Sequence, residues 1–214
     1  MNPLIEALRF YFITDDGAPV HAPIDQVRAA IEGGAGLIQY RNKSYTDTFL
    51  QELFHIRDVC REKGVGLVIN DNIDLAEQVG ADGVHLGQSD DPPALARQRM
   101  GPEAIVGVSV SDLAELAVTD LTACDYMGTG PVFATGTKAD AKTVKGLDGF
   151  QKIVDKAPLP VVAIGGITAE NARSCFEYGA SGIAVISYIS RAKNPVEKAR
   201  KLGDVCRDWF RPTG

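Results

Sequence analysis

The chain has 214 residues, of which 45% are hydrophobic, and this is enough for one well-buried core. Its 22 basic and 28 acidic residues give a net charge of −6, which disfavours a general nucleic-acid or anionic-membrane binder, because such binders need a basic face. The N-terminus has no basic segment followed by a long apolar run, so we expect no signal peptide, no membrane span and a location in the cytoplasm. The length predicts a single domain over residues 1–214.

Eight short apolar runs predict strands, in chain order Phe10–Ile13, Gly36–Tyr40, Gly66–Ile69, Gly83–Leu86, Ile105–Val108, Asp125–Gly128, Pro160–Ile164 and Gly182–Ile186. They are rich in Val, Ile and Leu and alternate little with polar residues, which is typical of strands buried on both faces of a parallel sheet. Segments with helical spacing follow them, at Ile24–Glu32, Thr46–Lys63, Asn72–Val79, Pro93–Arg99, Leu113–Val118, Gly149–Lys156, Ala169–Tyr178 and Pro195–Phe210. Thr168 and Asn194 are the predicted helix caps.

The alternation of strands and helices fits either a closed parallel barrel or an open doubly wound sheet. The count of eight favours the α/β fold called the (β/α)8 or TIM barrel. Gly33, Gly80 and Gly179 support it, because each stands where a helix ends and a short connection leads into the next strand.

Polar residues follow most of the predicted strands at their C-terminal ends. They include Thr14 to Asp16, Gln39 to Lys43, Asn70 and Asp71, Gly87 to Asp90, Ser109, Gly130 to Lys138, Gly165 to Ile167, and Ser187. The opposite strand ends carry mostly Gly, Ala and Asp. Because barrel enzymes place their catalytic residues just after the C-terminal strand ends, one functional face is predicted there.

The chemistry of this face suits two anions. Arg41, Lys43 and Lys138 are cations that can bind several phosphate oxygens. Asp71 and Asp90 are hard oxygen ligands which, with substrate phosphates and water, make a typical Mg2+ environment. The Gly-Gly-Ile-Thr turn of residues 165–168 leads into a predicted helix, and its backbone amides favour a second phosphate.

Each of these features also has a simpler interpretation. Asp71 could cap the helix that starts at Asn72, Asp90 could cap the helix after Pro93, and the glycine pair could mark only a tight turn. His85 lies inside a predicted strand and is interpreted as an interior residue whose hydrogen bonds are satisfied, not as a base. The four cysteines form no CxxC pair and are expected to be buried free thiols.

Nearly the whole chain resembles the thiamine phosphate synthases. The matching stretches are Tyr11 to Asp15, Gln39 to Lys43, Asn70-Asp71, Ala81 to Gln88, Asp90, Gly107 to Ser109, Gly130 to Phe133, Thr135 to Lys138, Ala163 to Ile167 and Val185 to Ser187. The resemblance implies that the chain is a transferase of thiamine biosynthesis whose partners are two small molecules, a pyrimidine diphosphate and a thiazole phosphate. The resemblance is also compatible with a homo-oligomer.

The resemblance also implies the residue roles. Substrate binding is assigned to Gln39, Tyr40, Arg41, Asn42, Lys43, Asn70, Ser109 and Lys138 on the pyrimidine diphosphate side, and to Thr135, Gly136, Thr137, Gly166, Ile186 and Ser187 on the thiazole phosphate side. Arg41, Lys43, Ser109 and Lys138 are the implied catalytic residues, and Asp71 and Asp90 the implied Mg2+ ligands. Substitution is expected to be dissociative: diphosphate leaves, and the thiazole nitrogen captures the pyrimidine-methylene cation without a general base.

Three departures from the family pattern are Ala134 in place of a common proline, the small Gly136, and Cys124 before Asp125-Tyr126. Three rival functions share parts of the pattern: a thiazole tautomerase-like paralogue, a non-catalytic sensor and a phosphosugar isomerase. The joint presence of the acidic pair and the three cations disfavours the first two. The irregular segment Gly130–Gly146 is expected to act as a lid that brings Lys138 to the site.

Overall fold

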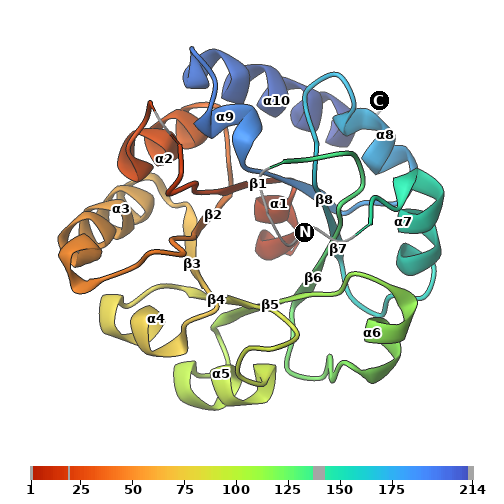
Figure 1. Cartoon of the computed structure of the whole chain (residues 1–214), viewed down its shortest axis with the longest axis horizontal. Helices are drawn as coiled ribbons and strands as arrows, with labels where there is room; N and C mark the ends of the chain where they lie inside the picture. The colour runs from red at the N-terminus through yellow and green to blue at the C-terminus, as the bar shows by residue number, and fades with distance from the viewer. Residues whose placement is uncertain (1, 19, 137–142, 212–214) are drawn as a thin grey trace.

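The computed structural model describes residues 2–18, 20–136 and 143–211. Its strands are β1 Phe10–Ile13, β2 Leu37–Tyr40, β3 Gly66–Asn70, β4 Gly83–Leu86, β5 Ile105–Ser109, β6 Tyr126–Thr129, β7 Val161–Ile164 and β8 Gly182–Val185. Each strand pairs in parallel with the next, and β8 pairs with β1, so the sheet closes into a barrel ringed by helices (Figure 1). The predicted TIM barrel is thereby confirmed, and the open sheet is excluded.

Alternate residues of each strand serve two different cores. In β1, Tyr11 and Ile13 belong to a cluster that fills the barrel interior, whereas Phe10 and Phe12 belong to the larger cluster between the sheet and the helices. This alternation explains why the strand sequences are mostly apolar: both faces of the sheet are buried.

The helices are α1 Pro3–Leu8, α2 Pro23–Glu32, α3 Leu50–Lys63, α4 Ile73–Val79, α5 Pro93–Met100, α6 Leu113–Val118, α7 Gly146–Val154, α8 Ala172–Glu177, α9 Ser187–Ser190 and α10 Pro195–Phe210, with a short 3-10 helix η1 at Asp47–Phe49. The helix expected from Thr46 thus begins as η1. Asn194 caps α10, as predicted, through its bond from the Glu197 amide. Thr168 does not cap α8, because the helix begins later and Asn171 stands at its N-cap.

Helix α1, which no sequence pattern predicted, lies across the N-terminal end of the barrel, as Figure 1 shows at the centre of the ring. Leu8 is fully buried, and Leu4 and Ala7 pack against the interior cluster. Two glycines make room for the helix: a Cβ on Gly36 would lie 2.6 Å from the Ala7 Cα, and one on Gly182 would lie 1.8 Å from the Leu8 carbonyl oxygen. The barrel is therefore closed at this end, and its open end is the opposite one.

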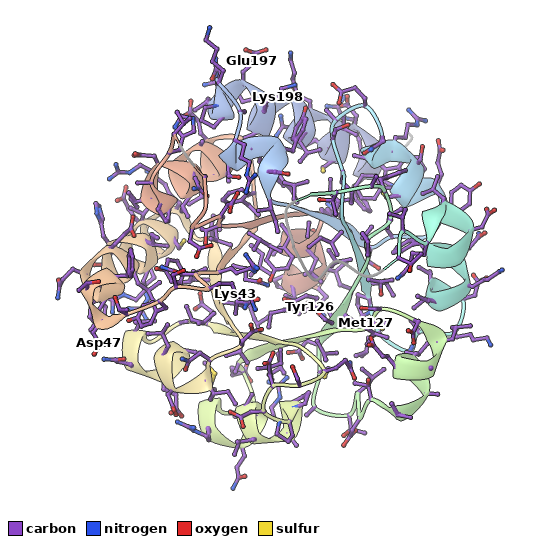
Figure 2. The ribbon with its side chains drawn as sticks, in the orientation of Figure 1. Lys43, Asp47, Tyr126, Met127, Glu197 and Lys198 are labelled. Atoms are coloured by element: carbon purple, nitrogen blue, oxygen red, sulfur yellow. The ribbon has the colours of Figure 1, made fainter. Side chains whose placement is uncertain are left out.

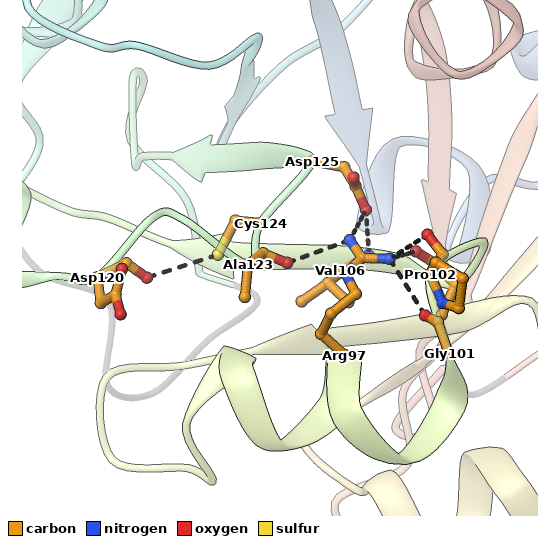
Figure 3. A network of polar contacts seen from close by, with 9 residues as sticks. Arg97, Gly101, Pro102, Val106, Asp120, Ala123, Cys124 and Asp125 are labelled. Atoms are coloured by element: carbon orange, nitrogen blue, oxygen red, sulfur yellow. Dashed lines mark hydrogen bonds and ion pairs between the residues drawn. The ribbon is translucent and has the colours of Figure 1, made fainter.

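One arginine ties α5 to the N-terminal ends of β5 and β6 (Figure 3). The Arg97 guanidinium donates to the carbonyls of Pro102 at 2.9 Å and Ala123 at 3.1 Å, and to the Asp125 carboxylate at 2.7 Å. The same Asp125 oxygen accepts the amide of Val106 at 2.8 Å. This network connects three elements through a single side chain.

All four cysteines are free and buried, as predicted. Burial raises the pKa of Cys60, Cys175 and Cys206 to about 12 and that of Cys124 to about 11, so these thiols stay protonated and unreactive at neutral pH. Within the residues that the structure describes, no helix is long and apolar enough to cross a membrane.

Candidate functional site

A cavity of roughly 350 Å3 lies at the C-terminal end of the barrel, where the polar residues were predicted to gather. Ten of the predicted site residues line it: Arg41, Lys43, Asn70, Asp71, Asp90, Ser109, Thr135, Gly166, Ile186 and Ser187. They come from the last residues of seven of the eight strands or from the segments that follow them. The barrel therefore brings together residues that are up to 146 positions apart in the sequence, from Arg41 to Ser187.

The loop that carries the two cations is held by side chains that follow β1. The Thr14 hydroxyl accepts the Arg41 amide at 2.8 Å and donates to the Arg41 carbonyl at 3.1 Å. The Asp16 carboxylate accepts the amides of Lys43 at 3.0 Å and Ser44 at 3.3 Å. Both cations are thus positioned through their backbone, which leaves their charged groups available to the cavity.

Arg41 is a buried cation for which the described residues offer no side-chain partner. Its side chain lines the cavity although the residue is only 7% exposed. Among the described residues, none accepts a hydrogen bond from its guanidinium or forms an ion pair with it. A buried charge is costly unless it is paired, so this arrangement favours binding of an anion. Lys43 differs, because its ammonium lies 3.2 Å from an Asp71 carboxylate oxygen.

Asp71 and Asp90 face each other at the ends of β3 and β4. Burial, together with the neighbouring Asp71 carboxylate, raises the pKa of the Asp90 carboxyl. Asp90 also accepts the Gly87 amide at 2.6 Å, and Asp71 adopts a left-handed backbone with φ of 64° while its amide donates to the His85 carbonyl at 2.9 Å. A non-glycine residue in this conformation is uncommon and is held by its surroundings.

The simpler interpretation of these two aspartates as helix caps is wrong. The cap of α4 is Asn72, whose side chain accepts the Leu75 amide at 2.8 Å. Helix α5 begins after Pro92 and has no side-chain cap. Neither carboxylate is therefore used as a helix cap, and both residues line the cavity.

The donor set fits a hard divalent cation. Two carboxylates whose mutual repulsion contributes to a raised pKa would be stabilised by positive charge between them, and oxygen ligands are the kind that Mg2+ prefers. In the described ranges, no group of three or more His, Cys, Asp or Glu side chains is arranged to hold a metal. An ion at this pair would complete its coordination with water and substrate oxygens.

The turn after β7 passes close to the loop that follows β6. Gly165 and Gly166 have φ of 100° and 66°, and a Cβ on Gly166 would lie 2.5 Å from the Ala134 carbonyl oxygen. In the described part of the chain, the amides of Gly166 and Ile167 donate to no protein acceptor. Helix α8 begins only at Ala172, so these amides, rather than a helix N-terminus, are the groups that can bind a phosphate.

Polar side chains inside the barrel form the floor below the cavity. His85 contacts the Ser109 hydroxyl at 2.9 Å and the Tyr126 hydroxyl at 3.0 Å, which agrees with its interpretation as a satisfied interior residue. Gln39 lies deeper, is 2% exposed and donates to the Tyr11 hydroxyl at 2.6 Å. Figure 2 shows Tyr126 and Lys43 over the centre of the barrel, with Asp47 at its periphery.

Some predicted residues do not line the cavity. Tyr40 is buried between the sheet and the helices, and its hydroxyl accepts a bond from Asn42 at 3.3 Å. Gly136 is exposed. Thr137 and Lys138 lie outside the described residues, so their roles, and the expected lid, stay predictions.

The cavity also includes residues that the sequence did not single out, among them Ser111, Glu115 and Tyr188. Glu115 lies on α6 and accepts the Ser111 amide at 2.6 Å, and Tyr188 lies on α9. No motif pointed to them, because the recognisable polar residues stand at the strand ends, whereas these side chains belong to the helices or loops that follow.

Comparisons with known proteins show which family the chain resembles. The family model described as thiamine monophosphate synthase matches residues 10–189. The chain is 42% identical to the thiamine-phosphate synthase of Azorhizobium caulinodans over 91% of this chain and 93% of that protein, and 43% identical to that of Chloroflexus aurantiacus over 91% and 90%. The structure of a thiamine phosphate pyrophosphorylase from Pyrococcus furiosus is similar, with a TM-score of 0.85, 36% identity and coverage of 97% of this chain and 99% of that one.

Proposed function

Because this chain belongs to the thiamine monophosphate synthase family, we propose that it joins a hydroxymethylpyrimidine diphosphate to a phosphoethyl thiazole, with release of diphosphate. The bond between the pyrimidine methylene carbon and the diphosphate oxygen breaks, and the leaving group takes the electron pair. The lone pair of the thiazole nitrogen then forms the new carbon–nitrogen bond. That nitrogen carries no proton, so no general base is needed for capture.

The observation that supports this proposal most directly is the buried guanidinium of Arg41, which has no partner among the residues that the structure describes and lines the same cavity as the acidic pair of Asp71 and Asp90. A diphosphate carries several negative oxygens, and its departure increases the charge on the leaving oxygen. Arg41 and Lys43 would bind these oxygens and stabilise the developing charge, and Lys138 would add a third cation.

Asp71 and Asp90 would hold Mg2+. When it is bound, the ion supplies positive charge that neutralises phosphate oxygens of the leaving group. The role of the two residues is to position it: the Asp90 carboxylate is restrained by the Gly87 amide, and the Asp71 backbone amide is held by the His85 carbonyl.

The thiazole phosphate would bind at the other end of the cavity. The amides of Gly166 and Ile167, with Thr135 and Ser187, provide donors for a phosphate, and Ile186 provides an apolar wall for the ring. Gly136 and Thr137 belong to the same loop as Thr135. The pyrimidine would lie between these groups and the cations, in contact with Asn70 and Ser109 and with Gln39 below them.

The proposal is tested by mixing both substrates with the purified chain, with and without Mg2+, and measuring thiamine phosphate. A tautomerase-like paralogue would leave the pyrimidine diphosphate intact, and a sensor would bind ligands without turnover. The cytoplasmic location, the single-domain organisation and a homo-oligomeric state are also proposals. Separation of cell fractions and light scattering of the purified protein test the location and the oligomeric state.

A further inference from the structure

Five polar side chains cross the barrel interior in one continuous hydrogen-bond chain. In order they are Gln39 on β2, Tyr11 on β1, Tyr126 on β6, His85 on β4 and Ser109 on β5. The successive distances are 2.6 Å, 2.9 Å, 3.0 Å and 2.9 Å. We call this set the interior hydrogen-bond chain. Of its members, only Ser109 lines the cavity.

The sequence makes room for the interior hydrogen-bond chain with two glycines. A Cβ on Gly107 would lie 2.2 Å from the Tyr126 ring carbon Cζ, and one on Gly128 would lie 3.3 Å from the His85 ring. Gly107 pairs with Tyr126 in the sheet, so the missing side chain leaves the space that the tyrosine ring fills. Two large polar rings thus occupy positions that apolar residues could have filled without the free-energy cost of burying polar groups.

The donors and acceptors of the interior hydrogen-bond chain give it a direction. The amide nitrogen of Gln39 can only donate, so the Tyr11 oxygen accepts from it. Tyr11 and Tyr126 are buried, and a buried hydroxyl proton needs an acceptor. Every proton is placed when Tyr11 donates to Tyr126 and Tyr126 donates to Nδ1 of His85. In the opposite direction, the Tyr11 proton has no acceptor within the chain.

The His85 imidazole extends this order of donors and acceptors to the cavity. If Nδ1 of His85 accepts from Tyr126, Nε2 carries the ring proton and donates to the Ser109 oxygen. The Ser109 hydroxyl is then an acceptor on its inner side and presents its own proton to the cavity. Burial raises the pKa of both tyrosines, which keeps them protonated, and therefore donors, in the working pH range.

We infer that Tyr11, Tyr126 and His85 are positioning residues for the pyrimidine: they fix Ser109 as a hydrogen-bond donor toward a ring nitrogen of that substrate. A ring nitrogen with a lone pair is an acceptor, so the fixed direction matches it, whereas a freely rotating serine would be oriented only on binding. The identity of the ligand rests on the proposed function, but the direction of the interior hydrogen-bond chain does not.

The direction is tested in the wild-type protein by NMR of 15N-labelled histidine, with His21→Gln and His55→Gln used to assign the signals. The expected result is a single His85 tautomer, protonated at Nε2 and unprotonated at Nδ1, in the absence of any substrate. A tautomer protonated at Nδ1 would overturn the inference, and so would a mixture of the two. This measurement does not depend on whether the chain makes thiamine phosphate.

The coupling to the substrate is tested by a double-mutant cycle of Tyr126→Phe and Ser109→Ala. Tyr126→Phe is expected to lower kcat/KM for the pyrimidine diphosphate about tenfold, to change the KM of the thiazole phosphate by less than about twofold, and to lose most of its effect when Ser109 is already alanine. Equal effects in both backgrounds would mean that Tyr126 acts only on the fold, and would overturn the inference.

The matched control is Tyr45→Phe, because the buried hydroxyl of Tyr45 has no hydrogen-bond partner in the described residues. It removes the same atom from a tyrosine outside the interior hydrogen-bond chain and should leave both substrate KM values unchanged. Should Tyr126→Phe fail to fold, Tyr11→Phe breaks the same chain one link earlier and is expected to shift kcat/KM in the same direction, again only when Ser109 is present.

Discussion

At the scale of single residues, the site consists of charges that the protein itself leaves incompletely compensated. Arg41 is buried without a counter-ion in the described residues, and Asp71 and Asp90 are close enough for their repulsion to contribute to a raised pKa. Such groups reduce the stability of the empty protein and bind complementary ions more tightly. In the proposed function, the substrate diphosphate and the divalent cation would supply the two missing partners.

Arg41→Gln should therefore separate stability from function. The variant loses a buried unpaired charge, so the empty protein should unfold at the same temperature as the wild type or higher, while turnover falls by about 100-fold or more. Inorganic diphosphate with Mg2+ should raise the melting temperature of the wild type but not of Arg41→Gln. Arg173→Gln, which removes an exposed arginine paired with Glu177, is the control for net charge. Equal stabilisation of Arg41→Gln by diphosphate would contradict the assignment.

The effect of Asp90→Asn on the stability of the empty protein should depend on pH. Because burial and Asp71 raise the pKa of Asp90, the folded protein binds this proton more tightly than the unfolded chain, and the resulting stability is present at low pH and lost as the pH rises through the raised pKa. In EDTA at neutral pH, the variant should thus be at least as stable as the wild type, and the difference should vanish in acid. Turnover with Mg2+ should fall by about 100-fold or more.

The control for this variant is Asp91→Asn, an exposed neighbour that does not line the cavity. Thermal unfolding across pH and steady-state assays check both parts of the prediction. Full turnover of Asp90→Asn would show that this carboxylate is not needed to hold the ion.

At the scale of elements, the two ends of the barrel have different tasks. The N-terminal end is closed by α1 and fastened by the Arg97 network, and the C-terminal end carries the cavity. Because the two ends are built from different residues, stability and activity should respond to different substitutions.

Arg97→Ala should lower the free energy of unfolding by about 2–3 kcal/mol without a change in kcat of the folded enzyme, because one side chain makes several charged hydrogen bonds to α5, β5 and β6. Arg97→Lys should not restore the loss, since an ammonium cannot reproduce the planar guanidinium geometry. Arg99→Ala, which removes surface ion pairs on the same helix, should cost less than about 1 kcal/mol. Denaturant titration measures all three, and similar losses for Arg97→Ala and Arg99→Ala would refute the role of the network.

The turn after β7 gives a second prediction at this scale, with Gly64→Ala as a matched control. Gly64 and Gly166 both have φ of 66°, but a Cβ on Gly64 meets nothing within 4 Å, whereas one on Gly166 would meet the Ala134 oxygen at 2.5 Å. Gly64→Ala should cost about 1–2 kcal/mol of stability from backbone strain alone.

Gly166→Ala should cost more and should also raise the KM of the thiazole phosphate well above that of the pyrimidine diphosphate, because the turn must shift to relieve the contact. Unfolding curves and the two KM values check this. A change in stability with both KM values unaltered would mean that the turn is only structural.

At the scale of the whole molecule, the sequence predicted the architecture because the strands are largely buried on both faces and most of the helices that follow them have a clear spacing. The site followed from one rule, the gathering of strand C-terminal ends, which brought Arg41, Asp71 and Asp90 together correctly. Helix α9 was missed because it has only four residues, too few to show a period. Helix α1 was missed because it precedes the first strand and lies outside the alternation of strands and helices. Likewise, the barrel-facing contacts of Tyr11 and Tyr126 depend on packing across strands that lie 115 residues apart.

We propose that this barrel stabilises the departing diphosphate and positions the thiazole nitrogen to capture the resulting cation. The most direct measurement is a rapid-quench single turnover with excess enzyme and both substrates, in which diphosphate and thiamine phosphate are quantified together in Mg2+ and in EDTA. We expect the two products to appear in equal amounts with Mg2+ and EDTA to suppress both. Formation of thiamine phosphate at an undiminished rate in EDTA, or an intact pyrimidine diphosphate in the presence of Mg2+, would contradict the proposal.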